Sequence, residues 1–249
     1  MTTLLALELR RLLGRRFFHL IVLAAIAGGA IAGLVVYLRS NVSYSVDDLR
    51  GTLQGTTVPL VMASWLLGAS FIGAEWRAGT VTTLLTWEPR RVRVILSKAV
   101  AAALVAAIAT FALQAAIGGM LLPAALKHGT GTVDAMWLRT VGSLLGRGSV
   151  LAAMAALVGF SVGSIGRNTA FGLGVGFVYL GILEGGLLGG IFHGLRRWLV
   201  VGNSIVFVRG RPEPEIVGRS VIGAGLLLSA YTIGVLVVAV SIFRTRDVT

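Results

Sequence analysis

The chain has 249 residues, of which 56% are hydrophobic and 13% charged, and its mean hydropathy is +0.89. Soluble domains carry roughly 25% charged residues, so this composition excludes an ordinary soluble protein, and the lack of cysteine excludes disulfides and thiolate metal sites. The formal net charge is +12, but the basic residues flank apolar segments, so we expect membrane lipids as partners and no nucleic acid.

The first predicted element is an interfacial helix at residues 1–16. Its apolar positions at helical spacing are Leu5, Leu9, Leu12 and Leu13, whereas Glu8, Arg11 and Arg15 share another face. This pattern favours a helix that lies among lipid headgroups. The alternative is a plain basic flank that only orients the next segment.

The first membrane span is predicted at 17–38, a run that contains no Asp, Glu, Lys or Arg. At about 1.5 Å per residue it is long enough to cross a hydrocarbon core of roughly 30 Å. Because the run is longer than the apolar core of a signal peptide, we interpret it as an uncleaved span.

Further apolar segments predict a total of six transmembrane helices. The later spans are expected at 56–74, 99–123, 141–165, 170–190 and 221–243. Polar loops are expected at 39–55 and 124–138, and a tight turn at 166–168. The connection 191–220 contains the apolar run 198–208, which is too short to span, so we interpret this connection as a partly re-entrant or interfacial outer segment. A miscounted fifth span is the alternative.

The distribution of basic residues orients these spans. Nine basic residues lie just before the first span or between the second and third spans: Arg10, Arg11, Arg15, Arg16, Arg77, Arg90, Arg91, Arg93 and Lys98. The loop between the first and second spans has only Arg39 and Arg50. The positive-inside rule therefore places both termini in the cytoplasm. The connection 191–220 departs from this rule, because its arginines would lie outside. We expect an all-α membrane protein, a single transmembrane domain over residues 1–249, in a bacterial plasma membrane.

Small and polar residues inside the spans predict how the helices pack. Glycines recur four residues apart at Gly29 and Gly33, Gly159 and Gly163, Gly172 and Gly176, and Gly181, Gly185 and Gly189, which favours close helix packing over a ligand site. Arg147 and Glu184 fall at similar depths in their spans, where a charge costs several kcal/mol unless it is paired or hydrated. We expect them to pair with each other, or else to line a polar translocation path. Gln114 is expected to make a helix–helix hydrogen bond.

The stretch 75–98 is the densest patch of charge in the interior of the sequence. Gly79 can bend or end a helix that leaves the membrane, and Pro89 favours a turn or a new helix start. Leu84 and Leu85 can pack into a groove on a partner, with the arginines that follow at its rim. The alternative is a solvated basic loop that only anchors the protein.

The six spans, the basic amphipathic N-terminus and this stretch together resemble the ABC-2 family of ATP-binding-cassette transporter permeases. The residues that carry the resemblance are Glu75, Gly79, Thr80, Leu84, Leu85, Thr86, Pro89, Val92 and Lys98. The resemblance covers nearly the whole chain in layout and implies a cytoplasmic coupling helix, outer re-entrant helices, and two permeases with two ATPases per transporter. The ATPase-coupling residues that it implies are Glu75, Arg77, Gly79, Thr80, Leu84, Leu85, Arg90 and Arg91.

Catalytic motifs are missing from the sequence. It has no GxxxxGK[ST] phosphate loop, and its three histidines, His19, His128 and His193, form no ligand cluster. We therefore expect no enzyme and no cofactor in this chain, with ATP and Mg held by the partner ATPase. The predicted function is the membrane-spanning permease subunit of an ATP-driven exporter, working with a second permease copy, as a homodimer or with a close paralogue. The alternative is a non-transporting membrane scaffold or sensor that recruits a cytoplasmic partner through the same stretch.

Overall fold

The computed structural model describes residues 2–39, 43–81, 83, 90–129, 131–188 and 193–245. All regular structure in these residues is helical, as predicted. Five of the described helices are long and apolar enough to cross a membrane, which makes the chain a multi-pass membrane protein.

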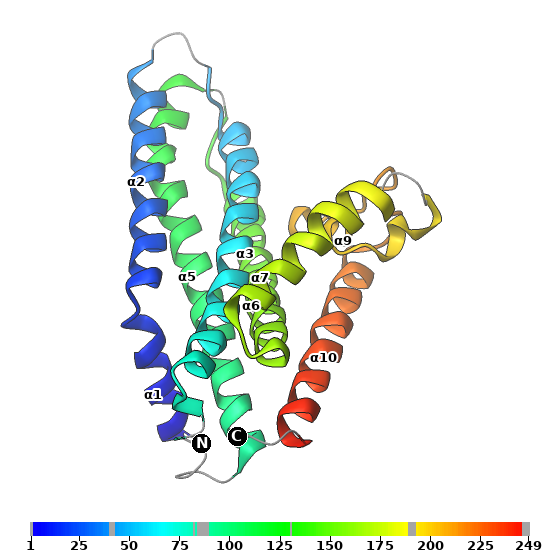
Figure 1. Ribbon diagram of the computed structural model, residues 1–249. Coiled ribbons are helices and arrows are strands. Elements are labelled where there is room, and N and C mark those ends of the chain that lie inside the picture. Colours follow the sequence, from blue (N-terminus) through cyan, green and yellow to red (C-terminus); the bar gives the residue numbers. More distant parts are fainter. Residues whose placement is uncertain are drawn as a thin grey trace.

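The five long helices form the body of the molecule (Figure 1). They are α2 (Arg16–Leu38), α3 (Val46–Arg77), α5 (Arg91–His128), α6 (Ala135–Gly166) and α10 (Val221–Thr245). The shorter elements are α1 (Thr2–Leu13), α7 (Thr169–Phe177), the π-helix η1 (Val178–Leu188), the 3₁₀-helix η2 (His193–Trp198) and α9 (Val200–Arg209).

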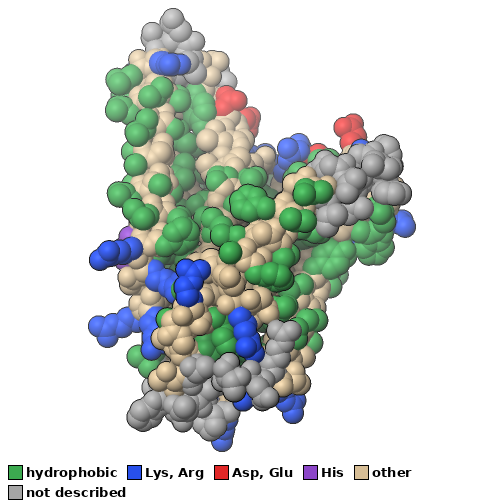
Figure 2. Space-filling view, viewed as in Figure 1, with side chains coloured by type: hydrophobic (Ala, Val, Ile, Leu, Met, Phe, Trp, Pro, Cys, Tyr) green, Lys and Arg blue, Asp and Glu red, His purple; other side chains and the backbone are tan. Residues whose placement is uncertain are grey.

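Both chain termini lie at the same end of the bundle (Figure 1). The last turn of α3 at Arg77, the start of α5 at Arg91 and the turn between α6 and α7 lie there too, and we call this the terminal end. Helices α3, α5 and α6 pack against one another at the centre, with α2 on α5 and α10 on α6. In Figure 2, apolar side chains cover the visible faces of the long helices, and most of the visible Lys and Arg side chains lie over the half that contains the terminal end.

Glycines bring the central helices close together. Gly68 on α3 faces the main chain of Ala156 on α6, and Gly159 on α6 faces the main chain of Trp65 on α3, so a side chain at either position would clash with backbone. The predicted packing role is confirmed for Gly29, Gly33, Gly159, Gly163, Gly172 and Gly176, each of which approaches a neighbouring helix. It is not found for Gly181, where an added Cβ would meet no atom within 4 Å. The environments of Gly185 and Gly189 lie outside the part of the chain that the structure describes.

The polar loops predicted at 39–55 and 124–138 are largely wrong, because the helices run further than the apolar spans. Ser45 and Asp48 form a capping box, in which Ser45 Oγ accepts a hydrogen bond from Asp48 N at 3.1 Å and Asp48 Oδ2 accepts one from Ser45 N at 2.8 Å. This box starts α3 well before the apolar run. Asp134 likewise caps the start of α6.

The tight turn predicted at 166–168 is confirmed. Arg167 closes α6 in the left-handed conformation, with φ 50°, and Asn168 caps α7 by accepting a hydrogen bond from Ala170 N at 2.9 Å. The next predicted span, 170–190, corresponds to α7 followed by η1, which is not among the five long helices. The apolar run 198–208 forms α9, which packs against α10 and α6.

Candidate functional site

A buried cluster of charges joins three helices at the terminal end. Lys98 Nζ on α5 lies 2.8 Å from Glu8 Oε1 on α1 and 2.7 Å from Glu75 Oε2 on α3. All three residues are buried, with exposed fractions of 1% for Lys98, 2% for Glu8 and 9% for Glu75. We call this cluster the Glu8–Lys98–Glu75 triad. Since removal of one partner would leave the others charged and buried, the triad specifies how α1, α3 and α5 meet.

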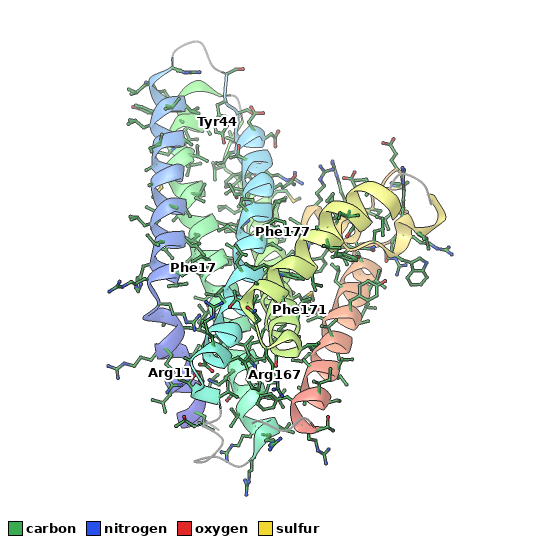
Figure 3. The ribbon with its side chains drawn as sticks, viewed as in Figure 1. Arg11, Phe17, Tyr44, Arg167, Phe171 and Phe177 are labelled. Carbon is green, nitrogen blue, oxygen red and sulfur yellow. The ribbon has the colours of Figure 1, made fainter. Side chains whose placement is uncertain are left out.

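Glu8 and Arg11 share a face of α1, as predicted, with Arg11 Nη1 3.7 Å from Glu8 Oε1, but Glu8 itself is buried against the bundle. Leu12, on the same face, is fully buried in a core with Phe71 of α3 and other apolar side chains. Arg11 extends away from the bundle (Figure 3). The carboxylate of Glu8 is stable on the buried face because α5 supplies a cation to it.

Arg15 adds a fourth charge to this region. Its guanidinium donates to Ser70 O at 3.1 Å and to Phe71 O at 3.3 Å, both on α3. Burial lowers the pKa of Arg15, and the nearby Glu75 and Glu8 carboxylates partly offset this effect. Two carboxylates thus face Lys98 and Arg15, and the exposed Arg11 adds a third cation 3.7 Å from Glu8 Oε1.

Trp76 extends the network to the remaining helices at the terminal end. Its ring lies 4.7 Å from Cζ of Arg167, in the turn between α6 and α7, and its centroid lies 5.9 Å from that of Phe243 near the end of α10, edge to face. Glu75 and Trp76 therefore connect the last turn of α3 to α1, α5, α10 and the α6–α7 turn. The Trp76 contacts could not be predicted from the sequence, because they join residues far apart in the chain.

The predicted coupling residues divide into buried and exposed ones. Glu75 is buried in the triad, whereas Arg77 and Thr80 are exposed. Gly79 has a φ of 65°, a conformation that favours glycine, and directs the chain out of α3. Thr80 Oγ1 donates to Glu75 O at 3.2 Å and stabilises this exit.

The chain re-enters the described structure at Arg90, which is exposed and precedes the first residue of α5, Arg91. Leu84 and Leu85, predicted to contact a partner, lie outside the described residues, as does the rest of 84–89. The structure therefore gives both ends of the predicted coupling helix, but most of the helix itself lies outside the described residues.

Arg147 and Glu184 do not pair with each other, since no ion pair between them occurs among the described residues. Glu184 Oε1 on η1 instead accepts a hydrogen bond from Val201 N, in the first turn of α9. Gly210, with φ 71°, ends α9, and a side chain there would occupy the space of the Arg147 guanidinium. The two charges therefore lie at opposite ends of α9.

Gln114 makes the predicted helix–helix hydrogen bond. The side chain is fully buried on α5, and its Nε2 donates to Thr57 Oγ1 at 2.8 Å and to Leu53 O at 3.3 Å, both on α3. Its Oε1 faces Gly148 on α6 and has no hydrogen-bond partner. Gln114 therefore joins α5 to α3 at a point where both helices lie against α6.

The described ranges contain no group of three or more His, Asp or Glu side chains placed to hold a metal ion. Comparisons with protein-family models and with curated proteins find no match.

Proposed function

We propose that the chain is the membrane-spanning permease subunit of an ATP-driven exporter of the ABC-2 type, coupled through residues 75–98 to a separate ATPase subunit. The observation that carries this proposal is the Glu8–Lys98–Glu75 triad. It connects the residue at which the coupling stretch leaves α3 to two other helices. A force applied to this stretch is thereby transmitted to α1 and α5 as well as to α3.

The mechanism would be mechanical. Closure of two ATPase subunits around ATP and Mg displaces the coupling stretches of two permease copies. Because Glu75 is bonded to Lys98 and Trp76 contacts the α6–α7 turn and α10, the terminal end moves as one unit. The spans then tilt between inward-open and outward-open arrangements. The permease itself makes and breaks no covalent bonds.

In this proposal both termini and the coupling stretch face the cytoplasm of a bacterium, across its plasma membrane. The arginines at the terminal end support this orientation through the positive-inside rule. The segment α7–η1 would be the fifth of six spans, α9 a re-entrant outer helix, and α1 a helix at the cytoplasmic interface.

The test compares two variants of α3 that each remove one carboxylate. Glu75→Gln neutralises the triad at the terminal end, and Asp47→Asn neutralises an exposed carboxylate in the first turn at the opposite end. Each variant is purified with the ATPase that copurifies with the wild-type chain and reconstituted into vesicles, where ATP turnover is measured. We expect Glu75→Gln to lower ATP turnover per bound ATPase molecule at least tenfold from the wild-type value, and Asp47→Asn to leave it unchanged.

Two results would contradict the proposal. Purification of a stable chain with no ATPase would indicate a scaffold or a sensor. Equal turnover for Glu75→Gln and the wild type, with the ATPase still bound, would mean that force does not pass through the triad. The thermal unfolding midpoint of each variant, measured in the same detergent, separates loss of coupling from loss of folding.

A further inference from the structure

Two arginines meet on one exposed tryptophan at the end of η2. The ring centroid of Trp198 lies 5.0 Å from Cζ of Arg219 and 5.7 Å from Cζ of Arg197. Arg219, which comes just before α10, also donates to Arg197 O at 3.3 Å. The fold thus places two like charges beside one aromatic side chain, which is 46% exposed.

Neither of these two cations has an anionic partner among the residues that the structure describes. No ion pair joins Arg197 or Arg219 to a carboxylate anywhere in the described ranges. The neighbouring arginines differ, because Arg209 and Arg211 lie 3.1 Å and 3.0 Å from Glu213 Oε1. Hydrogen bonds from Arg209 and then Arg211 lower the pKa of Glu213, so this carboxylate stays ionised. The nearby Glu184 instead accepts from a main-chain N–H of α9.

The surroundings of Trp198 match the headgroup level of a membrane. Tyr231 of α10 donates from its hydroxyl to Trp198 O at 3.0 Å, and its side chain is 38% exposed. Exposed Trp and Tyr side chains are typical of the membrane interface. Along α10 the exposed side chains are apolar, and they include Ile222, Leu226, Ile233 and Val237.

We propose that Arg197, Arg219 and Trp198 form a binding site for the phosphodiester group of an anionic phospholipid. A guanidinium matches the geometry of phosphate oxygens, and the single negative charge of a phosphodiester would offset part of the positive charge of Arg197 and Arg219. A lipid is the ligand because the arginines adjoin two exposed aromatic side chains and an apolar helix face, on which acyl chains can lie. The proposed lipid site does not depend on the proposed transport function. It gives a role to Arg197 and Arg219, which lie away from the terminal end.

The test measures lipid retention by the full-length chain in detergent. Native mass spectrometry follows binding of phosphatidylglycerol and of phosphatidylcholine, each with and without excess inorganic phosphate. We expect the wild type to prefer phosphatidylglycerol. Arg219→Gln should reduce that preference about fivefold, and Arg197→Gln with Arg219→Gln about thirtyfold. The matched control, Arg211→Gln, removes a charge that already has a carboxylate partner and should change the preference less than about twofold.

Three results would overturn the proposed lipid site. The first is equal retention of the two lipids by the wild type, and the second is an equal loss of the phosphatidylglycerol preference in Arg211→Gln and Arg219→Gln. The third is complete displacement of phosphatidylglycerol by inorganic phosphate, which would indicate a site for free phosphate. Arg219→Lys keeps the positive charge and should lose less preference than Arg219→Gln. An equal loss in these two variants would contradict the electrostatic basis of the site.

Discussion

Arg147 and Glu184 lie at opposite ends of α9 and are not paired with each other. The Glu184 carboxylate accepts a hydrogen bond at the start of the helix, and the Arg147 guanidinium lies against Gly210 at its end. An α-helix has a partial positive charge at its N-terminus and a partial negative charge at its C-terminus. Each side chain therefore lies at the helix end that its own charge stabilises. A short apolar helix thus has a charged side chain beside each of its ends where it packs on α6 and α10.

Glu184→Ala should loosen the start of α9. Loss of the cap costs about 1–2 kcal/mol, so hydrogen exchange of the amides at 200–209 should accelerate by about tenfold while α3 stays protected. Glu215→Ala removes an exposed carboxylate from the same outer segment and serves as the control. Equal acceleration in the two variants would show that Glu184 does not hold α9.

Lys98→Met should strongly destabilise the protein. It removes the principal cation of Glu8 and Glu75 while both carboxylates stay buried, at a cost of about 3–5 kcal/mol in the free energy of unfolding. The measurement is the shift of the thermal unfolding midpoint in detergent. Lys127→Met, at the other end of α5, removes an exposed amine that contacts Tyr37 and should cost less than about 1 kcal/mol. Adding Glu8→Gln and Glu75→Gln to Lys98→Met should recover part of the loss. A triple variant no more stable than Lys98→Met would argue against a charge effect.

Gly68→Ala should separate α3 from α6. The added Cβ would overlap the main chain of Ala156, and overpacking of this kind costs about 1–3 kcal/mol. Gly119→Ala on α5 would meet no atom within 4 Å, so helix propensity alone should stabilise it by about 0.5–1 kcal/mol. Opposite shifts of the unfolding midpoint are therefore expected, and shifts of the same sign would contradict the close approach of α3 and α6.

Gln114 and Thr57 should be energetically coupled. A double-mutant cycle with Gln114→Met and Thr57→Val should give a coupling free energy of about 0.6–1.7 kcal/mol, as for hydrogen bonds between membrane helices. Thr232→Val is the control, because Thr232 is also buried but bonds within its own helix. Its cycle with Gln114→Met should be additive within about 0.5 kcal/mol. Equal coupling free energies in both cycles would mean that the coupling does not come from the hydrogen bond between Gln114 and Thr57.

The sequence predicted the features that depend on local pattern. The span at 221–243 matches α10, and glycines such as Gly159 lie at helix contacts as their spacing indicated. The beginning of α3 also had a local signal, the capping pair Ser45 and Asp48, but the polar residues after it were interpreted as a loop. Length and apolarity define where a helix can cross the membrane, not where the helix itself begins.

The features that the sequence did not predict depend on tertiary contacts. Periodicity correctly placed Glu8 beside Arg11, but nothing near Glu8 in the chain indicates its second cation, Lys98 on α5. The partners of Arg147 and Glu184 were missed for the same reason. Similar depth in two spans made an ion pair plausible, whereas their actual partners are the ends of a third helix, α9, whose placement follows from packing.

The triad also affects the order of biogenesis. Lys98 comes 90 residues after Glu8, so α1 and α2 leave the ribosome long before the cation of the triad is made. Until then, the Glu8 carboxylate has only the exposed Arg11 of its own helix as a counterion, and α1 stays hydrated at the lipid surface. Docking of α1 is therefore a late event of synthesis, which waits until the translocon has released α5.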